Sequence, residues 1–199
     1  FKYRNPAIIL ADGVIGQMME KVVLPEQRTR LTDEEVIARC PWATTGRTHH
    51  RTPNIITSLE LDPAEMEKRN IHLQKKYAEI EENEVRFEEL HCEDAEYLIV
   101  AFGSCARIAQ KAMEIAREEG IKVGLLRPIT LWPFPSKAIA ARAAQVKGIL
   151  TVELNAGQMV EDVRLAVECK VPVEHFGRLG GIVPDPDEVI TALKEKLIK

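Results

Sequence analysis

The clearest hydrophobic pattern lies in the second half of the chain, where short apolar runs alternate with amphipathic stretches. Residues 97–102 are almost continuously apolar, and residues 104–119 follow with apolar positions on one helical face, ended by Gly120. The alternation continues with strands expected at 121–126, 149–153 and 171–176 and helices at 136–146, 157–168 and 186–197. Strands that are apolar on both faces and are each followed by a helix predict an α/β fold, a three-layer αβα sandwich around a mostly parallel sheet.

The first half of the chain has a weaker pattern. Residues 7–11 (Ala-Ile-Ile-Leu-Ala) predict a buried strand, and residues 14–23 predict a short helix. One strand and one helix cannot bury each other's apolar faces, so we expect this pair to pack on further material in a larger fold. Residues 24–61 contain no sustained period, which predicts a long connection.

A long helix is expected after this connection. Asp62, Pro63 and Glu65 have the spacing of an N-cap, a first helical residue and a capping glutamate. The helix carries one narrow stripe formed by Met66, Asn70, Leu73, Tyr77 and Ile80. Such a stripe favours docking on a partner surface or packing within its own domain, and both interpretations stay open. Residues 85–91 then predict a short edge strand.

Composition narrows the classes of function. The 199 residues are 45% hydrophobic and 29% charged, which is typical of a globular protein, and the net charge of −4 is spread along the chain. This balance provides no strong field for nucleic acid or for an anionic membrane. No run reaches the length of a membrane span and no signal peptide is recognisable, so we expect a cytoplasmic protein.

The four cysteines are Cys40, Cys92, Cys105 and Cys169. They lie far apart and form no C-x-x-C pair, so they offer neither zinc nor an iron–sulfur cluster a local set of ligands. We predict reduced, structural thiols.

A weak candidate for an anion site follows the strand at 97–102. Gly103 and Ser104 occupy the turn into the next helix, where backbone N–H groups can hold a phosphate or a carboxylate. The dinucleotide pattern G-x-G-x-x-G is absent, which favours the simpler interpretation that Ser104 is an N-cap after a turn glycine. Cys105 has no histidine or second cysteine nearby in sequence, so the pattern predicts no catalytic cysteine.

Three loops have polar groups without a decisive signature. Residues 153–158 (Glu-Leu-Asn-Ala-Gly-Gln) follow a strand at its carboxyl end, where they either bind a ligand or use Asn155 as a helix cap. Residues 177–181 form a glycine-rich loop without a metal signature. The third loop carries a basic cluster of Arg47, His49, His50 and Arg51, which suits an anion, a partner chain or solvent. We predict no catalytic residue and no metal ligand.

Residues 97–135 resemble core domain II of the 2-oxoacid:ferredoxin oxidoreductases, a domain similar to the carboxy-terminal domain of transketolases. The specific feature is the segment Leu-Arg-Pro-Ile-Thr-Leu-Trp-Pro-Phe-Pro at 126–135, at the right distance from the Gly-Ser turn. Residues 5–20 look like the end of the pyrimidine-binding thiamine domain of the alpha subunit, and the segments 153–158 and 176–178 fit the same subunit. The resemblance covers nearly the whole chain and indicates a carboxy-terminal portion of that subunit.

The resemblance implies a division into three parts and an oxidative decarboxylation. Residues 1–24 would end the pyrimidine-binding domain, residues 25–95 would connect, and residues 96–199 would form core domain II. In the family a 2-oxoacid and coenzyme A give an acyl-CoA and carbon dioxide, and ferredoxin is reduced. The complete complex is expected to use thiamine diphosphate, Mg²⁺, coenzyme A and [4Fe-4S] clusters. Beta and gamma or delta subunits are the expected partners.

The chain alone is expected to be inactive and to bind none of these cofactors. The glutamate that activates thiamine is expected upstream of Phe1, and the diphosphate-binding domain is expected on the beta subunit. Residues 41–83 look most like the 2-oxoisovalerate type, with the 2-oxoglutarate type next. Two alternatives remain: a non-catalytic assembly module, and the carboxy-terminal domain of a transketolase or pyruvate dehydrogenase E1 beta type enzyme.

Overall fold

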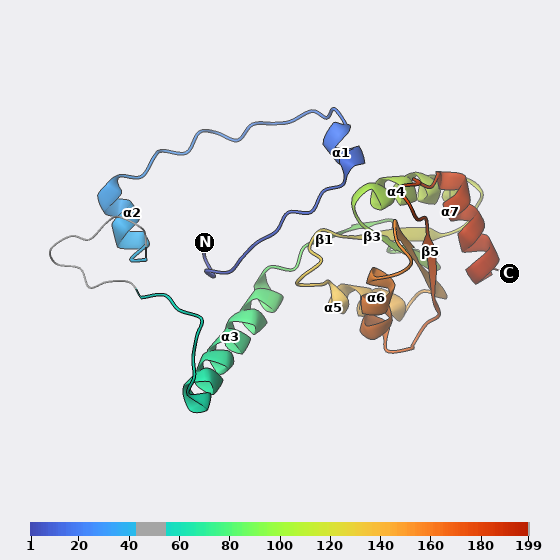
Figure 1. Cartoon of the computed structure of the whole chain (residues 1–199). Helices are drawn as coiled ribbons and strands as arrows, with labels where there is room; N and C mark the ends of the chain where they lie inside the picture. The colour runs from blue at the N-terminus through green and yellow to red at the C-terminus, as the bar shows by residue number, and fades with distance from the viewer. Residues whose placement is uncertain (43–54, 199) are drawn as a thin grey trace. The chain divides into compact units, whose positions relative to one another are not determined.

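The computed structural model describes residues 1–42 and 55–198, and these divide into two compact units. Unit 1 comprises Phe1–Met18 and Gln74–Lys199, and unit 2 comprises Met19–Leu73. The division falls inside the long helix α3 (Pro63–Asn83), which is drawn with the other elements in Figure 1. Each unit is described by itself.

Unit 1 is built on a five-stranded sheet in the order β1-β3-β2-β4-β5. Its strands are β1 (Phe87–Leu90), β2 (Tyr97–Ala101), β3 (Val123–Pro128), β4 (Gly148–Glu153) and β5 (Val173–Gly177). Only β1, at one edge, runs antiparallel to its neighbour, and the other pairs are parallel. The mostly parallel sheet and the edge strand expected at 85–91 are therefore confirmed.

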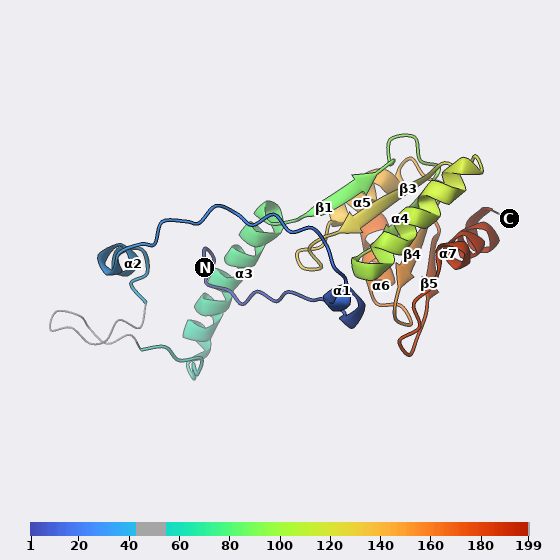
Figure 2. The same ribbon diagram turned by 90° about the horizontal axis from the view of Figure 1, so that it is seen from above.

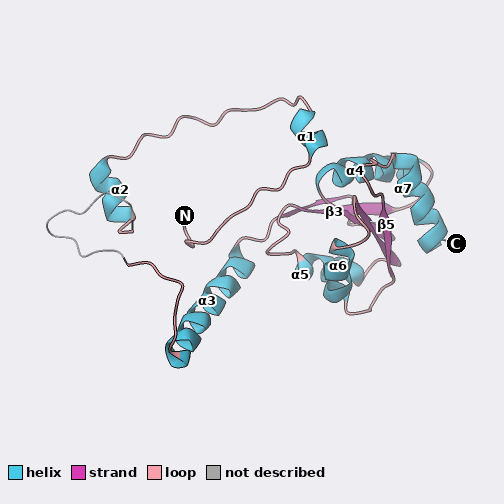
Figure 3. Cartoon of the chain, viewed as in Figure 1, coloured by secondary structure: helices cyan, strands magenta, loops and turns pink. Residues whose placement is uncertain are grey.

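Helices cover both faces of this sheet, as Figures 1 and 2 show. They are α4 (Gly103–Glu118), α5 (Ser136–Ala143), α6 (Met159–Val167) and α7 (Pro186–Leu193), and a short π-helix, η1 (Lys194–Ile198), follows α7. Helices α4 and α7 lie on one face, and α5 and α6 lie on the other. This arrangement confirms the three-layer αβα sandwich, and Figure 3 shows the alternation of strands and helices that the sequence predicts.

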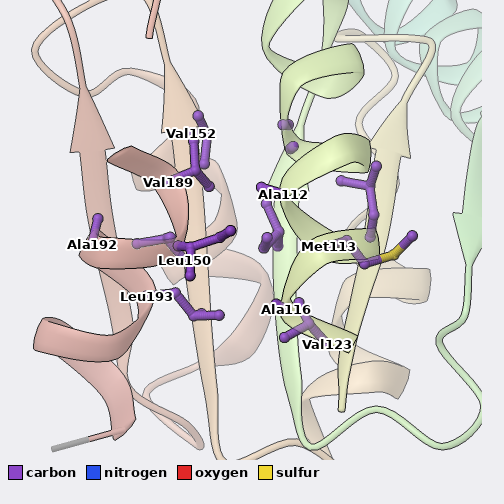
Figure 4. Close-up of a cluster of buried hydrophobic side chains, with 14 of the residues drawn as sticks. Ala112, Met113, Ala116, Val123, Leu150, Val152, Val189, Ala192 and Leu193 are labelled. Carbon is purple, nitrogen blue, oxygen red and sulfur yellow. The ribbon is translucent and has the colours of Figure 1, made fainter. Parts of the chain in front are cut away.

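The core has one apolar cluster on each face of the sheet. All six residues of β4 are buried, and alternate side chains serve the two clusters: Leu150 and Val152 face α4 and α7, while Ile149 faces α5 and α6. Figure 4 shows the first cluster, where Ala112 and Ala116 bring the α4 backbone close to the sheet. Full burial of one side chain such as Leu150 stabilises the fold by about 1.5–3 kcal/mol.

The amino-terminal part of unit 1 differs from the sequence prediction. Residues 1–12 contain neither helix nor strand, so the strand expected at 7–11 is wrong. A strand needs a neighbour for its backbone N–H and C=O groups, and these apolar residues have none here: Ile9 is 96% exposed. The helix expected at 14–23 is limited to α1 (Gly13–Gln17), and the apolar side chains of Met19, Val22 and Val23 that follow it are exposed.

Unit 2 contains a helix that the sequence analysis missed. Helix α2 (Asp33–Arg39) lies inside the region expected to be a long connection. Its signal is a capping box: the Thr32 hydroxyl accepts from the Glu35 backbone N–H at 3.3 Å, and the Thr32 N–H donates to the Glu35 carboxylate at 2.9 Å. The remaining described residues of this connection, 24–32, 40–42 and 55–61, contain no helix or strand.

Helix α3 begins where the sequence predicts. The Asp62 carboxylate accepts from the backbone N–H groups of Ala64 and Glu65 at 2.8 and 3.2 Å, which satisfies the first turn. At its other end, within unit 1, Ile80 is 6% exposed and the Tyr77 ring meets Trp132 edge-on at 5.7 Å between centroids. A partner-facing stripe is therefore wrong for Ile80, which is buried in this chain.

Two further points concern a possible membrane span and the basic cluster. Among the described residues, no helix has both the length and the apolar character that a bilayer crossing requires. The basic cluster of Arg47, His49, His50 and Arg51 lies outside the described residues.

Candidate functional site

The sheet of unit 1 has a switch point between β2 and β4. Helix α4 leaves the carboxyl end of β2 toward one face, while α6 leaves the carboxyl end of β4 toward the other. In open α/β sheets, ligands bind where adjacent connections diverge in this way. The turn at Gly103 and Ser104 and the loop at residues 154–158, both singled out from sequence, therefore follow neighbouring strands.

Ser104 contacts a carboxylate from a distant part of the chain. Its hydroxyl donates to Asp12 Oδ2 at 2.6 Å, and Asp12 Oδ1 accepts from the Ile15 backbone N–H at 2.8 Å and so caps α1. These bonds, that from Ile15 first, lower the pKa of Asp12 below its ordinary value. The sequence could not pair two residues 92 positions apart.

Ser104 is not the N-cap of α4, so that interpretation is wrong. The N-cap is Phe102, which has no side-chain capping bond, and the helix begins at Gly103 with a φ of 57°. The glycine accepts this left-handed conformation without strain. The Ser104 hydroxyl is left to bind Asp12 instead.

Cys105 lies next to this contact but is not activated. Its side chain is buried, and burial, followed by the negative charges of Glu153 and Asp12, raises the pKa of the thiol to about 11. Burial likewise raises the pKa of the Cys92 thiol to about 11. Thiols with such pKa values are protonated at neutral pH, so neither is a ready nucleophile or metal ligand.

Glu153, at the end of β4, organises the second loop. It is 1% exposed, and its carboxylate accepts from the backbone N–H groups of residues 158–160 at 3.2, 2.8 and 3.1 Å. A strand side chain thus caps α6 from outside the helix. The cap expected from Asn155 is wrong, because its side chain accepts from the Gly157 N–H at 2.7 Å inside the loop.

His175 on β5 completes a polar cluster that the sequence analysis missed. Its Nδ1 lies 3.2 Å from Thr151 Oγ1 and 3.4 Å from Glu153 Oε1, and its Nε2 lies 3.3 Å from the Asn155 carbonyl oxygen. Thr151 and His175 are register partners on adjacent strands. The alternating pattern alone could have suggested that β4 and β5 are neighbours. Only the structure gives the register that pairs Thr151 with His175.

The glycine-rich loop at residues 177–181 is held by an ion pair. Arg178 Nη1 lies 2.9 Å from Glu188 Oε1, and Glu188 also forms a capping box with Asp185 at the start of α7. Within the described ranges, no three His, Cys, Asp or Glu side chains are grouped to hold a metal ion. The described loop ends are thus polar, and their side chains are engaged in hydrogen bonds and ion pairs.

Comparison with known proteins identifies this domain. Residues 95–189, from just before β2 into α7, match the family described as pyruvate:ferredoxin oxidoreductase core domain II. The chain is 44% identical over 194 residues to ketoisovalerate oxidoreductase subunit VorB of Methanothermobacter marburgensis, covering 98% of this chain and 53% of that protein. The chain belongs to the 2-oxoacid:ferredoxin oxidoreductase family.

Two further matches have a lower identity. The 2-oxoglutarate synthase subunit KorA of Archaeoglobus fulgidus is 31% identical, over 93% of this chain and 52% of that protein. A solved 2-oxoglutarate:ferredoxin oxidoreductase from Magnetococcus marinus, with 2-oxoglutarate, coenzyme A and succinyl-CoA bound, matches with a TM-score of 0.60 and 26% identity. That match covers 68% of this chain and 24% of the solved chain. The chain spans about half the length of the curated relatives it matches.

Proposed function

We propose that this chain is part of the alpha subunit of a thiamine-diphosphate-dependent 2-oxoacid:ferredoxin oxidoreductase. The complete enzyme would convert a 2-oxoacid and coenzyme A into an acyl-CoA and carbon dioxide and pass two electrons to ferredoxin. The observation that carries the proposal is the 44% identity to a ketoisovalerate oxidoreductase subunit over 98% of the chain. The lower identity of 31% to a 2-oxoglutarate synthase subunit favours 2-oxoisovalerate as the substrate.

Within that enzyme the chain has a structural and assembly-related role. In the described residues every buried side-chain nitrogen and oxygen has a hydrogen-bond partner, as expected of side chains with structural roles. Apolar side chains remain exposed at Ile8, Ile9 and Leu10 and at Trp132, which is 51% exposed. Exposed apolar segments of this kind suit contacts with other parts of an assembly.

The three-part division remains part of the proposal. Residues 1–24 would end the pyrimidine-binding domain, residues 25–95 would connect, and residues 96–199 would be core domain II. The compact units support it only in part, because Phe1–Met18 belongs with Gln74–Lys199. The Asp12–Ser104 hydrogen bond is one contact that joins the first part to the third.

The cofactors are assigned to the complex rather than to this chain. We assign Mg²⁺ and the iron–sulfur clusters to the complete complex, as the family resemblance implies. Thiamine diphosphate and coenzyme A are also assigned to the complex, because the family resemblance implies that the complete enzyme uses them. The Gly103–Ser104 turn stays a weak candidate for an anion-accepting position, and in this structure its Ser104 hydroxyl donates to the Asp12 carboxylate.

Beta and gamma or delta subunits, with ferredoxin as electron acceptor, are the proposed partners. The printed names of the relatives describe subunits, which supports a multi-subunit enzyme. The described cysteines, Cys40, Cys92, Cys105 and Cys169, are free thiols, which supports a cytoplasmic location.

The test is reconstitution of the full-length protein with its partner subunits. Coenzyme-A-dependent reduction of ferredoxin is measured with 2-oxoisovalerate, 2-oxoglutarate and pyruvate in parallel. We expect the highest kcat/KM with 2-oxoisovalerate, and no reduction when any subunit is omitted. Preference for another 2-oxoacid would correct the substrate, and an assembled complex without activity toward any 2-oxoacid would leave only the assembly role.

A further inference from the structure

The exposed apolar side chains of the α/β domain gather at one end of its sheet. The parallel strands β2 to β5 all end there, and the antiparallel β1 begins there. Between residues 74 and 198, nine large apolar side chains are exposed, and eight of them belong to segments at this end. They lie at Phe87, within residues 129–132, at Leu154 and within residues 179–183, and the ninth is Leu165 on α6. We call these eight side chains the carboxyl-end surface.

The opposite end of the sheet, where the parallel strands begin, exposes charged side chains instead. Asp94 pairs with Arg117 at 2.6 Å, and Glu96 pairs with Lys122 at 3.5 Å and with Lys147. Paired charges are normal at a surface in water, and so are single apolar side chains scattered over it. Eight of nine at one end are not scattered, so the asymmetry marks the carboxyl-end surface as an interaction surface.

The amino-terminal segment of the chain meets the middle of this surface. The end of β2 is central, because β3 and β1 lie on one side of it and β4 and β5 lie on the other. At that position the Ser104 hydroxyl donates to Asp12 Oδ2 at 2.6 Å, and α1 lies against α4. Residues 8–10, which come just before Asp12, have side chains between 75% and 96% exposed. A body that packs on residues 8–10 is therefore held beside the carboxyl-end surface.

We propose that the carboxyl-end surface is the docking face for another part of the same full-length alpha subunit, the part that also packs on residues 8–10. This inference rests on the proposed function, because it needs a longer subunit around the chain. The chain covers 53% of a ketoisovalerate oxidoreductase subunit, so the rest of such a protein is nearly as long as the chain itself. That length is sufficient for a domain.

The chemistry of the surface defines the face that it accepts. Residues 102–106, 129–135, 154–158 and 179–184, which follow the four parallel strands, contain no Asp, Glu, Lys, Arg or His. The centres of protein interfaces are likewise depleted in charged residues, so the docked face should be apolar and without charges. A part of the same polypeptide is connected through residues 8–12, which makes its docking intramolecular and raises its effective concentration over that of a separate chain.

Hydroxyl-radical footprinting of wild-type proteins tests the docking. Oxidation rates of Trp132, Leu179 and Ile182, each relative to the rate in the urea-unfolded protein, are compared between the 199-residue chain and the full-length alpha subunit without its partners. Trp132 is 51% exposed in the chain, and burial to about a tenth of its surface should slow its oxidation about fivefold. Leu165, which is 76% exposed on α6, is the internal control and should give the same rate in both proteins.

Other footprints would overturn the proposal. Protection that appears only after the other subunits are added would assign the carboxyl-end surface to a partner, and protection that rises with alpha-subunit concentration would assign it to a second copy. Exposure in every sample would show that nothing docks there. None of these readouts depends on turnover. An inactive complex with a protected surface would contradict only the proposed function, whereas an active enzyme with an exposed surface would contradict only this inference.

A matched pair of substitutions provides a second test. Ile182→Asp and Leu165→Asp both place a charge at an exposed apolar position, so in the 199-residue chain both should change the melting temperature little. In the full-length alpha subunit we expect only Ile182→Asp to lower it, by about 2–4 °C or more, because the charge is then buried against an apolar face. Equal effects of the two substitutions in the full-length subunit would count against the docking.

Discussion

At the scale of single residues, buried polar groups at strand ends decide the shape of the loops. Glu153 is the clearest case, because a carboxylate that is almost fully buried takes three backbone N–H groups at the start of α6. A sequence analysis sees Asn155 and Gly157 as the loop-forming residues and Glu153 as the end of a strand. In the structure, Glu153 at the end of the strand has the larger role, because its carboxylate caps the first turn of α6.

Replacement of Glu153 by alanine should therefore destabilise the fold. It leaves the N–H groups of residues 158–160 without their acceptor in a buried place, and we expect a loss of about 2–4 kcal/mol in the free energy of unfolding. Urea denaturation of both proteins measures it. Glu161→Ala, an exposed position in the first turn of the same helix, is the control and should change stability by less than about 0.5 kcal/mol. Equal effects of the two changes would contradict the capping role.

The Asp12–Ser104 contact gives a prediction about pH. The pKa of Asp12 is lowered by the Ile15 backbone N–H and then by the Ser104 hydroxyl, so the carboxylate contributes stability above its unfolded pKa that is lost as pH falls. Ser104→Ala should raise the pKa of Asp12 toward its ordinary value. A ¹³C NMR titration of the Asp12 carboxyl group measures this directly. An unchanged Asp12 titration curve in the variant would show that the hydrogen bond does not hold the carboxylate.

At the scale of elements, the sequence predicted the α/β half of the chain well. The strand expected at 149–153 is Gly148–Glu153, and the helix expected at 104–119 is Gly103–Glu118. These elements bury their apolar residues within the chain, so the local pattern and the tertiary structure agree. The strand expected at 7–11 had the right apolar pattern, but a strand also needs a paired neighbour, which a local pattern does not report.

The sequence did not predict helix α2 or the polar cluster around His175, and the two have different reasons. Helix α2 has a readable capping box at Thr32 and Glu35, but no buried residue that would mark an apolar face. The cluster at His175 needs the register of β4 and β5, and the Asp12–Ser104 contact joins residues far apart in sequence. Sequence patterns identified the loops of the candidate site, and only the fold identified their contacts.

Helix α3 provides a prediction at this scale. Ile80 is buried within the chain, whereas Leu73 is half-buried, so the two positions of the same stripe should respond differently. We expect Ile80→Ala to lower the free energy of unfolding of the chain by about 2–4 kcal/mol through a cavity, and Leu73→Ala to cost much less. Chemical denaturation compares the two variants. Similar small losses in both would restore the interpretation of the whole stripe as a partner surface.

At the scale of the whole molecule, the chain combines a well-packed domain with exposed apolar segments. The core domain II region, residues 95–189, contains both buried clusters almost entirely, while Ile8, Ile9 and Leu10 stay exposed. The chain also covers about half the length of its curated relatives. The exposed apolar segment at residues 8–10 agrees with the contacts to other parts of an assembly that the proposed function requires.

The isolated 199-residue chain should accordingly neither bind thiamine diphosphate tightly nor decarboxylate a 2-oxoacid. Decarboxylation by this family needs a cofactor held at both ends, a carboxylate that activates its ring and a nearby electron acceptor. In the described residues the acidic side chains are not grouped for Mg²⁺, and the buried carboxylate of Glu153 is used by α6. Calorimetric titration with thiamine diphosphate and Mg²⁺ is expected to show no binding in the micromolar range.

A matched titration of the reconstituted complex supplies the control for this prediction. There we expect tight binding together with ferredoxin reduction, because under the proposed function the cofactor groups belong to the complete complex. Micromolar binding by the chain alone would place a thiamine site within these residues. Ferredoxin-dependent turnover without a second subunit would go further, since it would require the electron acceptor to be bound here as well, and the assembly role proposed for the chain would then be wrong.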